Sequence, residues 1–294
     1  MIKVLVTGKD SQLARCIKDV EKGYKDILFV YKSSTELDIT NKDSIKLNFQ
    51  EDTYNYCINC AAYTNVDKAE TEQKKAILIN TVGSKNLAET CEINNTVLIH
   101  ISTDFVFDGK KNEPYTETDQ TNPLSVYGLT KRDGEKEIQK VLSKYFIIRT
   151  SWLYSRYGSN FVKTILKLAK EKNEINVVNN QIGSPTYAID LAVFILNIVS
   201  VNSIKYGLYN YSNKGEISWK DFALEIVNLY KLKLKIRPVH SSYHKTIVRR
   251  PEYSVLNLIN TSNVFKLKIN QWRESLRRFS LDYYKESFTS ISFK

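Results

Sequence analysis

The chain has 294 residues, of which 42% are hydrophobic and 26% are charged. This composition is typical of a soluble globular protein with one large or two modest domains. No window approaches the roughly 20 apolar residues of a membrane-spanning helix, and the apolar run at residues 4–6 is too short for a signal peptide. We therefore expect a cytoplasmic protein with no membrane partner.

The basic excess of the chain raises the question of nucleic-acid binding. Lys and Arg number 43 against 32 Asp and Glu, which gives a formal net charge of +11. The lysines are scattered, with no run of five, and the tightest arginine pairs lie at 249–250 and 277–278. A phosphorylated small substrate or an ordinary solvated surface explains such an excess equally well, and we expect no nucleic-acid partner.

The four cysteines do not indicate a disulfide framework in a chain of this length. Cys57 and Cys60 form a C-x-x-C pair, which could indicate redox chemistry or half of a zinc site. No second C-x-x-C completes such a site, and residues 56–62 resemble a buried strand in which free cysteine packs as a small hydrophobe. We expect no metal here.

The first half of the chain alternates short β-branched runs with amphipathic stretches, which is typical of a parallel α/β sheet. The run at 97–101 is continuously apolar, which indicates a central strand buried on both faces. In chain order, strands are expected at 4–6, 27–30, 57–60, 97–101 and 145–148, and helices at 12–20, 76–92 and 128–142.

After about residue 150 the pattern loosens into longer helices, at 161–172, 191–199 and 219–230, and isolated strands. We therefore predict a Rossmann-like, doubly wound parallel sheet over 1–150, which part of 180–205 could join. A smaller mixed α/β substrate domain should follow over 151–294. The sequence has no internal repeat or low-complexity linker, so the two domains should share a tight interface.

A Gly turn follows the first predicted strand. Gly8 ends the strand, and a helix is expected to start at Gln12, so backbone N–H groups there can bind a pyrophosphate. Short-chain reductases carry G-x-x-G-x-x-G at this point, and here Ser11 and Ala14 stand at the second and third glycines. Both residues are small, so close approach of a cofactor is retained. The turn alone would equally fit a generic strand–helix connection.

Tyr127 and Lys131 lie four residues apart, on one face of a predicted helix. The ammonium group can lower the pKa of the tyrosine from about 10 toward working pH. Such a tyrosine donates its proton to a carbonyl oxygen whose carbon receives hydride. Thr103 ends an adjacent strand and can bind the same oxygen. Y-x-x-x-K alone could be an ordinary exposed pair, but combined with the Gly turn and these strands it indicates a reductase.

Six segments of the chain resemble those of the dTDP-4-dehydrorhamnose reductases, in the extended short-chain dehydrogenase/reductase class. They occur in the order of that family over almost the whole chain. They are N-C-A-A-Y-T-N-V-D-K-A-E (59–70), S-T-D-F-V-F (102–107), Y-G-L-T-K (127–131), R-T-S-W-L-Y (149–154), Q-I-G-S-P-T (181–186) and R-R-P (249–251).

The resemblance implies a role for each matching residue. Tyr127 would be the proton donor, Lys131 its partner and a ribose ligand, and Thr103 the group that orients the carbonyl. Substrate contacts would come from Thr103, Asp104, Trp152, Arg249 and Arg250, although Trp152 could equally be a core aromatic residue and the arginines a surface pair. Cofactor contacts would come from Gly8, Ser11, Gln12, Leu13, Asp38, Ile39, Ala61, Ala62 and Tyr63, together with Tyr127 and Lys131.

Two departures from the family pattern bear on cofactors. Some members carry a carboxylate metal ligand where this chain has Ile189; Asp190 would point elsewhere on a helix, so no metal is expected. No acid follows the second strand to bind a ribose 2′-hydroxyl, and residues 31–34 are Tyr-Lys-Ser-Ser. Both NADPH and NADH are candidates, and this segment favours NADPH.

The predicted activity is reduction of the 4-keto group of dTDP-4-dehydro-6-deoxy-L-mannose to dTDP-L-rhamnose for surface polysaccharide. The predicted partner is thus a small nucleotide sugar, and the protein would be a monomer or a homodimer. One alternative is reduction or epimerisation of another nucleotide-linked 4-keto-6-deoxy sugar. Another is a non-catalytic, dinucleotide-binding regulatory subunit, against which the intact Thr103, Tyr127 and Lys131 argue.

Overall fold

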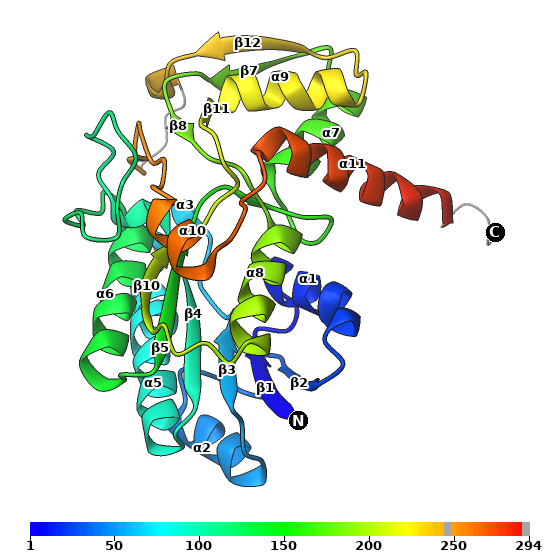
Figure 1. Ribbon diagram of the computed structural model, residues 1–294. Helices are drawn as coiled ribbons and strands as arrows, with labels where there is room; N and C mark the ends of the chain where they lie inside the picture. The colour runs from blue at the N-terminus through cyan, green and yellow to red at the C-terminus, as the bar shows by residue number, and fades with distance from the viewer. Residues whose placement is uncertain (244–247, 290–294) are drawn as a thin grey trace.

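A six-stranded, all-parallel sheet forms the centre of the molecule in the computed structural model, which describes residues 1–243 and 248–289 (Figure 1). The strand order is β2-β1-β3-β4-β5-β10. Because the order reverses between β1 and β3, this sheet has the switch point at which doubly wound folds bind ligands. The strands are β1 (Ile2–Thr7), β2 (Ile27–Lys32), β3 (Tyr56–Asn59), β4 (Val97–Thr103), β5 (Tyr145–Thr150) and β10 (Gly207–Asn210).

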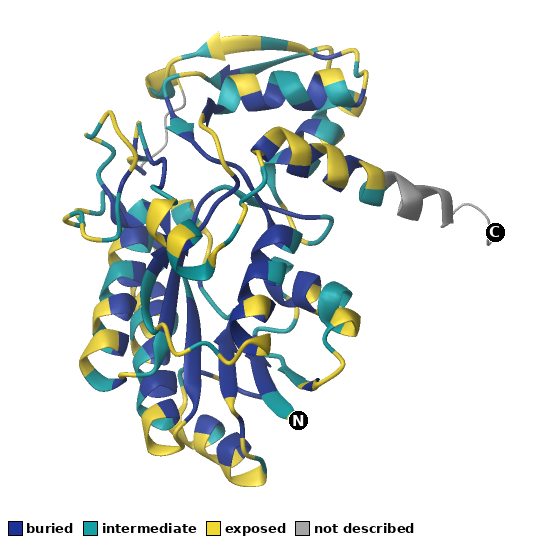
Figure 2. Cartoon of the chain, viewed as in Figure 1, coloured by how far each residue is buried: buried dark blue, intermediate teal, exposed yellow. Residues whose placement is uncertain are grey.

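Helices cover both faces of the sheet because its strands are apolar on both. Val4 and Val6 point to one face, where α1 (Gln12–Val20) and α8 (Ala188–Ser200) pack against them. Leu5 points to the other face, which is covered by α2 (Lys42–Glu51), α5 (Gly83–Ile93) and α6 (Val126–Val141). Figure 2 shows the strands buried between helices whose outer faces are exposed.

A smaller unit carries its own apolar core above the carboxyl ends of the strands (Figure 1). Its two longer strands, β7 (Glu174–Val178) and β12 (Lys235–Val239), pair in parallel and are flanked by α9 (Trp219–Leu229). The other elements here are α7 (Phe161–Glu171), α11 (Trp272–Thr289) and the short strands β6 (Leu153–Tyr154), β8 (Ile182–Gly183), β9 (Thr186–Tyr187) and β11 (Ile217–Ser218).

The expected elements are present, with one interruption in the predicted helix 76–92. It consists of α4 (Gln73–Ile77), a π turn (Leu78–Val82) and α5. Asn80 lies in the π turn and hydrogen-bonds the Tyr63 backbone through Oδ1 at 2.8 Å and Nδ2 at 3.0 Å. The wider turn lets this buried side chain reach the loop after β3, which periodicity alone does not indicate. The remaining short elements are η1 (Glu21–Gly23), α3 (Val66–Ala69), η3 (Asp104–Val106), η4 (Ser241–Tyr243) and α10 (Ile259–Phe265).

Asp190 joins α8 to α11. Its buried carboxylate accepts hydrogen bonds from Arg278 Nη1 at 2.6 Å, from Asn213 Nδ2 at 2.8 Å and from the Ser275 hydroxyl. Ile189, one residue earlier, packs against the apolar core between the sheet and α8 and also against the apolar core of the smaller unit. Asp190 therefore has a structural role in linking the smaller unit to the sheet.

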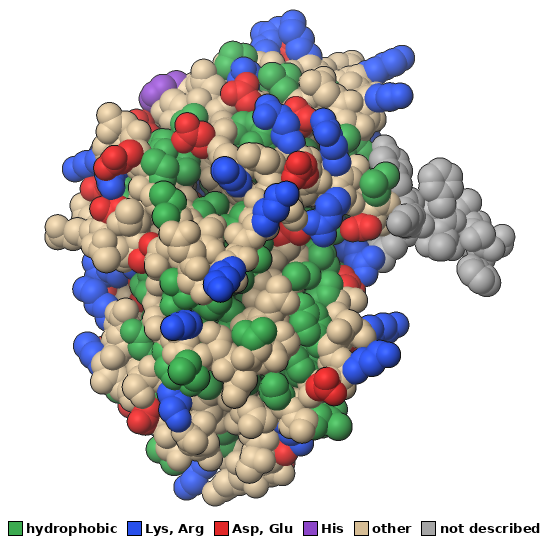
Figure 3. All heavy atoms as spheres, in the orientation of Figure 1, with side chains coloured by type: hydrophobic (Ala, Val, Ile, Leu, Met, Phe, Trp, Pro, Cys, Tyr) green, Lys and Arg blue, Asp and Glu red, His purple; other side chains and the backbone are tan. Residues whose placement is uncertain are grey.

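Lys and Arg side chains are dispersed over the face shown in Figure 3, with Asp and Glu among them. Within the described ranges, no helix is long and apolar enough to span a bilayer. Among the same residues, no group of three or more His, Cys, Asp or Glu is arranged to hold a metal ion.

Candidate active site

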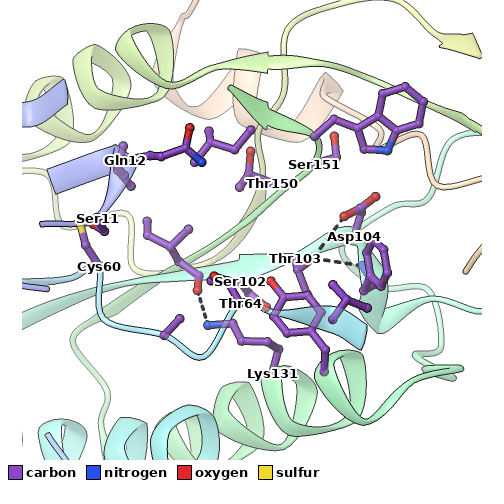
Figure 4. Close-up of a pocket in the computed structure, with 18 of the residues that line it drawn as sticks. Ser11, Gln12, Cys60, Thr64, Ser102, Thr103, Asp104, Lys131, Thr150 and Ser151 are labelled. Atoms are coloured by element: carbon purple, nitrogen blue, oxygen red, sulfur yellow. Dashed lines mark hydrogen bonds between the residues drawn. The ribbon is translucent and has the colours of Figure 1, made fainter. Parts of the chain in front are cut away.

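A cavity of about 630 Å³ opens at the carboxyl ends of the central strands (Figure 4). Both parts of the molecule contribute to it: the sheet provides the Gly-turn helix and the helix that carries Tyr127, and the smaller unit provides Trp219. The predicted residues that line it are Ser11, Gln12, Leu13, Ala62, Thr103, Asp104, Tyr127, Lys131 and Trp152.

Gly8 makes the close turn that precedes α1. Its φ is +63°, and a Cβ there would lie 2.8 Å from the backbone N of Ala61, so any other residue would collide. Ser11 caps α1, with Oγ accepting from the Ala14 N–H at 3.3 Å. The helix N-terminus is therefore held at the cavity, where its first backbone N–H groups suit an anion such as a pyrophosphate.

Tyr127 lies in the first turn of α6, which Ser125 caps by accepting from the Gly128 N–H at 3.1 Å. Gly128 allows the helix to approach the chain after β4, because a Cβ there would lie 2.1 Å from the Phe105 carbonyl oxygen. This packing brings the Tyr127 hydroxyl close to Thr103, and both side chains line the cavity. The sequence predicts that both hydroxyl groups bind one carbonyl oxygen, and this arrangement leaves both on the same cavity wall.

The expected lowering of the Tyr127 pKa by Lys131 is wrong. Burial raises the pKa of Tyr127 to about 12, and the nearby Thr103 hydroxyl offsets only part of that effect. Lys131 Nζ is instead directed at the Ile101 carbonyl oxygen, 2.6 Å away, and at His100 Nε2, 3.1 Å away. Burial lowers the pKa of Lys131 to about 8, although Glu135 opposes it.

Asp104 has an incompletely paired, buried carboxyl group at the cavity wall. Oδ1 accepts from the Thr103 hydroxyl at 3.1 Å, as Figure 4 shows, while Oδ2 has no hydrogen-bond partner among the described residues. Burial raises the pKa of Asp104 to about 6, and nearby Ser254 and Thr103 only partly offset this rise. A buried polar atom without a partner next to a cavity suits a ligand hydroxyl.

Trp152 is both packed and accessible to the cavity, so it fits both interpretations of the sequence. Its ring stacks on Trp219 with centroids 3.4 Å apart and planes 8° apart. Gly183, in the Q-I-G-S-P-T segment, provides the room, because a Cβ there would lie 2.5 Å from the Trp152 ring. The backbone of Trp152 has a φ of +45°, an uncommon conformation for a bulky residue.

The structure does not bring every predicted residue to this cavity. Arg249 and Arg250 line a neighbouring cavity of about 1080 Å³, where Arg250 Nη2 lies 3.1 Å from Asp67 Oδ2. Ile39 is buried against Gly83, and Asp38 is exposed and accepts from Thr40. Ala61 lies against Gly8, and the backbone of Tyr63 is bound by Asn80.

A buried ion pair behind the site has no counterpart in the sequence-based prediction. Glu135 accepts from Arg149 Nη2 at 2.7 Å and Nε at 3.0 Å, and also from the Ser102 hydroxyl. These contacts tie α6 to the ends of β4 and β5. Glu135 lies one turn after Lys131, on the face that carries Tyr127. The helical periodicity was therefore a signal that could have revealed it.

A second omission concerns the loop after β2. Glu36 Oε2 accepts from the Ser33 backbone N–H at 2.8 Å and hydroxyl at 2.6 Å, and lies 2.6 Å from Lys9 Nζ. Hydrogen bonds from Lys9 and Ser33 lower the pKa of Glu36 to about 2. An acid is thus present in this loop, but its charge is paired with Lys9.

Comparison with known proteins gives close matches over nearly the whole chain. The family model described as the RmlD substrate binding domain matches residues 2–285. The dTDP-4-dehydrorhamnose reductase of Aggregatibacter actinomycetemcomitans is 37% identical, over 94% of this chain and 98% of that protein. The spore coat polysaccharide biosynthesis protein SpsK of Bacillus subtilis is 39% identical, over 95% and 97% respectively.

Solved structures match as closely. The dTDP-4-dehydrorhamnose reductase of Bacillus anthracis in complex with NADP superimposes with a TM-score of 0.92 and 38% identity, covering 96% of this chain and all of that one. The Clostridium acetobutylicum orthologue also gives a TM-score of 0.92, at 39% identity, with coverage of 97% and 100%.

The doubly wound sheet, its Gly turn and the Tyr127 helix beside Thr103 define an oxidoreductase of the extended short-chain dehydrogenase/reductase class. Within that class, the family model and the relatives above are decisive. The chain belongs to the dTDP-4-dehydrorhamnose reductase family.

Proposed function

We propose that the protein reduces the 4-keto group of dTDP-4-dehydro-6-deoxy-L-mannose to a hydroxyl, giving dTDP-L-rhamnose for surface polysaccharide. The observation that carries the proposal is that Thr103 and Tyr127 lie close together on the wall of one cavity at the strand ends. The names of the relatives support the substrate.

The cavity suits a nicotinamide dinucleotide. The Gly8 turn leaves a space that a Cβ would fill, and the start of α1 offers N–H groups to a pyrophosphate. When bound, the cofactor supplies the hydride. Ser11, Gln12 and Leu13 would hold its pyrophosphate, Ala62 would lie along it, and Lys131 would bind its ribose. The sheet domain would thus bind cofactor, and the smaller unit would help to bind substrate.

Proton donation falls to Tyr127. With its pKa raised to about 12, the hydroxyl remains protonated throughout the neutral range. Thr103 would hold the substrate carbonyl oxygen against it, and the proton would pass from Tyr127 Oη to that oxygen as its carbon is reduced. Lys131 in its ammonium form would then stabilise the resulting phenolate.

The substrate sugar would meet Asp104 and Trp152. The unpaired Oδ2 of Asp104 would accept from a sugar hydroxyl, and the part of Trp152 that lines the cavity would pack against the ring. The neighbouring cavity would bind the diphosphate through Arg249 and Arg250, whose guanidinium groups match phosphate geometry.

We further propose a preference for NADPH, metal-independent activity, a cytoplasmic location and a monomeric or homodimeric state. Lys32 ends β2 and Ser34 follows it with a further donor for a 2′-phosphate, whereas Ser33 donates to Glu36, which is also paired with Lys9. The Bacillus anthracis relative was solved with NADP. Ile189 replaces a carboxylate, and the Asp190 side chain is engaged by Arg278.

The test is incubation with NADPH and a panel of nucleotide-linked 4-keto sugars, with products identified by NMR. We expect NADPH oxidation with dTDP-4-dehydro-6-deoxy-L-mannose and formation of dTDP-L-rhamnose. A relative from Streptomyces niveus, 34% identical, is named dTDP-4-keto-6-deoxy-D-glucose reductase, so that sugar belongs in the panel. If only that sugar is reduced, it replaces dTDP-4-dehydro-6-deoxy-L-mannose as the substrate. Tight NADPH binding without turnover of any sugar would indicate a regulatory subunit.

A further inference from the structure

Lys131 belongs to a buried line of polar side chains that crosses the sheet beneath the cavity. Thr7, Asn59 and His100 are register partners on β1, β3 and β4, so their side chains share the face covered by α6. All four residues are buried. The Thr7 hydroxyl donates to Asn59 Oδ1 at 2.7 Å, Asn59 Nδ2 lies 3.1 Å from His100 Nδ1, and His100 Nε2 lies 3.1 Å from Lys131 Nζ.

The orientation of the Asn59 amide fixes the tautomer of His100. The backbone N–H of Ala61 lies 3.2 Å from Asn59 Oδ1, and a backbone N–H can only donate. The amide oxygen must therefore face Ala61, which leaves the amide N–H group facing His100 Nδ1. That nitrogen must accept, so a neutral imidazole carries its proton on Nε2.

The Nε2 proton points at Lys131. An ammonium group has three donors and no acceptor, so it cannot accept this proton, whereas an uncharged amine can. The amine form can also donate to the Ile101 carbonyl oxygen at 2.6 Å, so both contacts of Lys131 are then satisfied. The ammonium form would instead place two donors 3.1 Å apart.

We propose that His100 is a positioning residue, which holds the Lys131 side chain in its retracted position only while the lysine is an uncharged amine. Protonation of Lys131 then moves its ammonium group away from His100 and toward the cavity. This inference rests on the proposed role of Lys131 beside Tyr127 and the cofactor ribose. Binding of cofactor, which selects the advanced ammonium form, would then be linked to uptake of a proton by Lys131.

The groups that surround Lys131 are consistent with this exchange. Glu135 on α6 raises the pKa of Lys131, but its charge is paired with Arg149 of β5. Cys60, after β3, has a thiol whose pKa is raised by burial and is uncharged. Tyr127, on the same helix, is protonated as well.

Burial dominates among these effects and lowers the pKa of Lys131 to about 8, so both forms of Lys131 are accessible near neutral pH. Burial and Lys131 also hold the pKa of His100 well below its usual range, so the ring stays neutral.

One test reads the tautomer directly, in the wild-type protein without cofactor. The chain has three histidines, and ¹⁵N NMR of their side chains distinguishes a protonated from an unprotonated ring nitrogen. We expect His100 to carry its proton on Nε2 from pH 7 to pH 9. A proton on Nδ1, with Nε2 accepting from Lys131, would overturn the proposal. No substrate is needed, so the result is independent of whether the proposed reaction occurs.

The second test uses NADPH binding, followed by its fluorescence between pH 7 and pH 10. In the wild type the Kd should rise about tenfold per pH unit above the Lys131 pKa, because only the ammonium form binds. In His100→Gln the amide oxygen can accept from the ammonium, so this rise should begin at least one pH unit higher. His240→Gln makes the same change at an exposed histidine and should follow the wild type.

A purely structural role for His100 predicts a different result. His100→Gln would then weaken NADPH binding by the same factor at every pH, and the position of the alkaline rise would not move. That outcome would overturn the proposal. If the variant fails to fold, the tautomer measurement still decides the question.

Discussion

Asp104→Asn should stabilise the protein in a way that depends on pH. The carboxyl pKa is raised from 3.8 to about 6 in the folded protein because the group is buried, and nearby Ser254 and Thr103 offset only part of this rise. The ionised form is therefore disfavoured by folding. Two pKa units correspond to about 3 kcal/mol, and this penalty is absent below pH 4 and complete above pH 7.

The amide of the Asp104→Asn variant does not titrate, which isolates the effect. Any hydrogen bond that the amide gains or loses changes the stability by the same amount at every pH. The melting temperature of Asp104→Asn minus that of the wild type should therefore grow by roughly 6–12 °C between pH 4 and pH 8, at about 2–4 °C per kcal/mol. Differential scanning calorimetry measures both proteins in matched buffers. A difference in melting temperature that stays constant from pH 4 to pH 8 would refute the argument that ionisation of Asp104 destabilises the folded protein.

Three further predictions concern the cofactor, metal and core. Lys32→Ala should lower kcat/KM for NADPH relative to that for NADH. A preference of the wild-type protein for NADH by more than about tenfold, or 1.4 kcal/mol, would refute our interpretation of the loop after β2. Activity should survive exhaustive chelation, because Ile189 replaces a carboxylate and Asp190 is engaged; loss restored by magnesium would contradict this. Glu135→Gln should lower the free energy of unfolding by about 3–5 kcal/mol, because it leaves Arg149 buried without its counter-charge. Calorimetry should show a lower melting temperature for the variant. An unchanged melting temperature would refute the stabilising role of the ion pair.

Much of the sheet could be predicted because its signals are local. The strand at 97–101 is continuously apolar and the helix at 12–20 is bounded by a Gly turn, and both appear as β4 and α1. β10 was missed, since it has only four residues and is defined by pairing with β5, far away in sequence. The π turn was missed for a similar reason, because it depends on Asn80 reaching Tyr63.

In the candidate site too, features with a local sequence signal could be predicted, whereas features that depend on contacts between distant segments could not. Spacing placed Tyr127 and Lys131 on one helix face, and strand order placed Thr103 beside them. Spacing does not reveal where an ammonium points, and here Lys131 is retracted toward His100 by contacts across three strands. The separate cavity that holds Arg249 and Arg250 likewise arises from the folding of the chain after β12, where no local signal indicates it.

Replacement of Tyr127 by Phe tests the central claim most directly. The ring and its edge-on contact with Phe105, at 5.7 Å between centroids, are retained while the proton donor is removed. With NADPH and dTDP-4-dehydro-6-deoxy-L-mannose, we predict that kcat falls by about 10²–10⁴, while the Kd for NADPH measured by fluorescence stays close to the wild-type value. An unchanged kcat would contradict the assignment of Tyr127 as the proton donor.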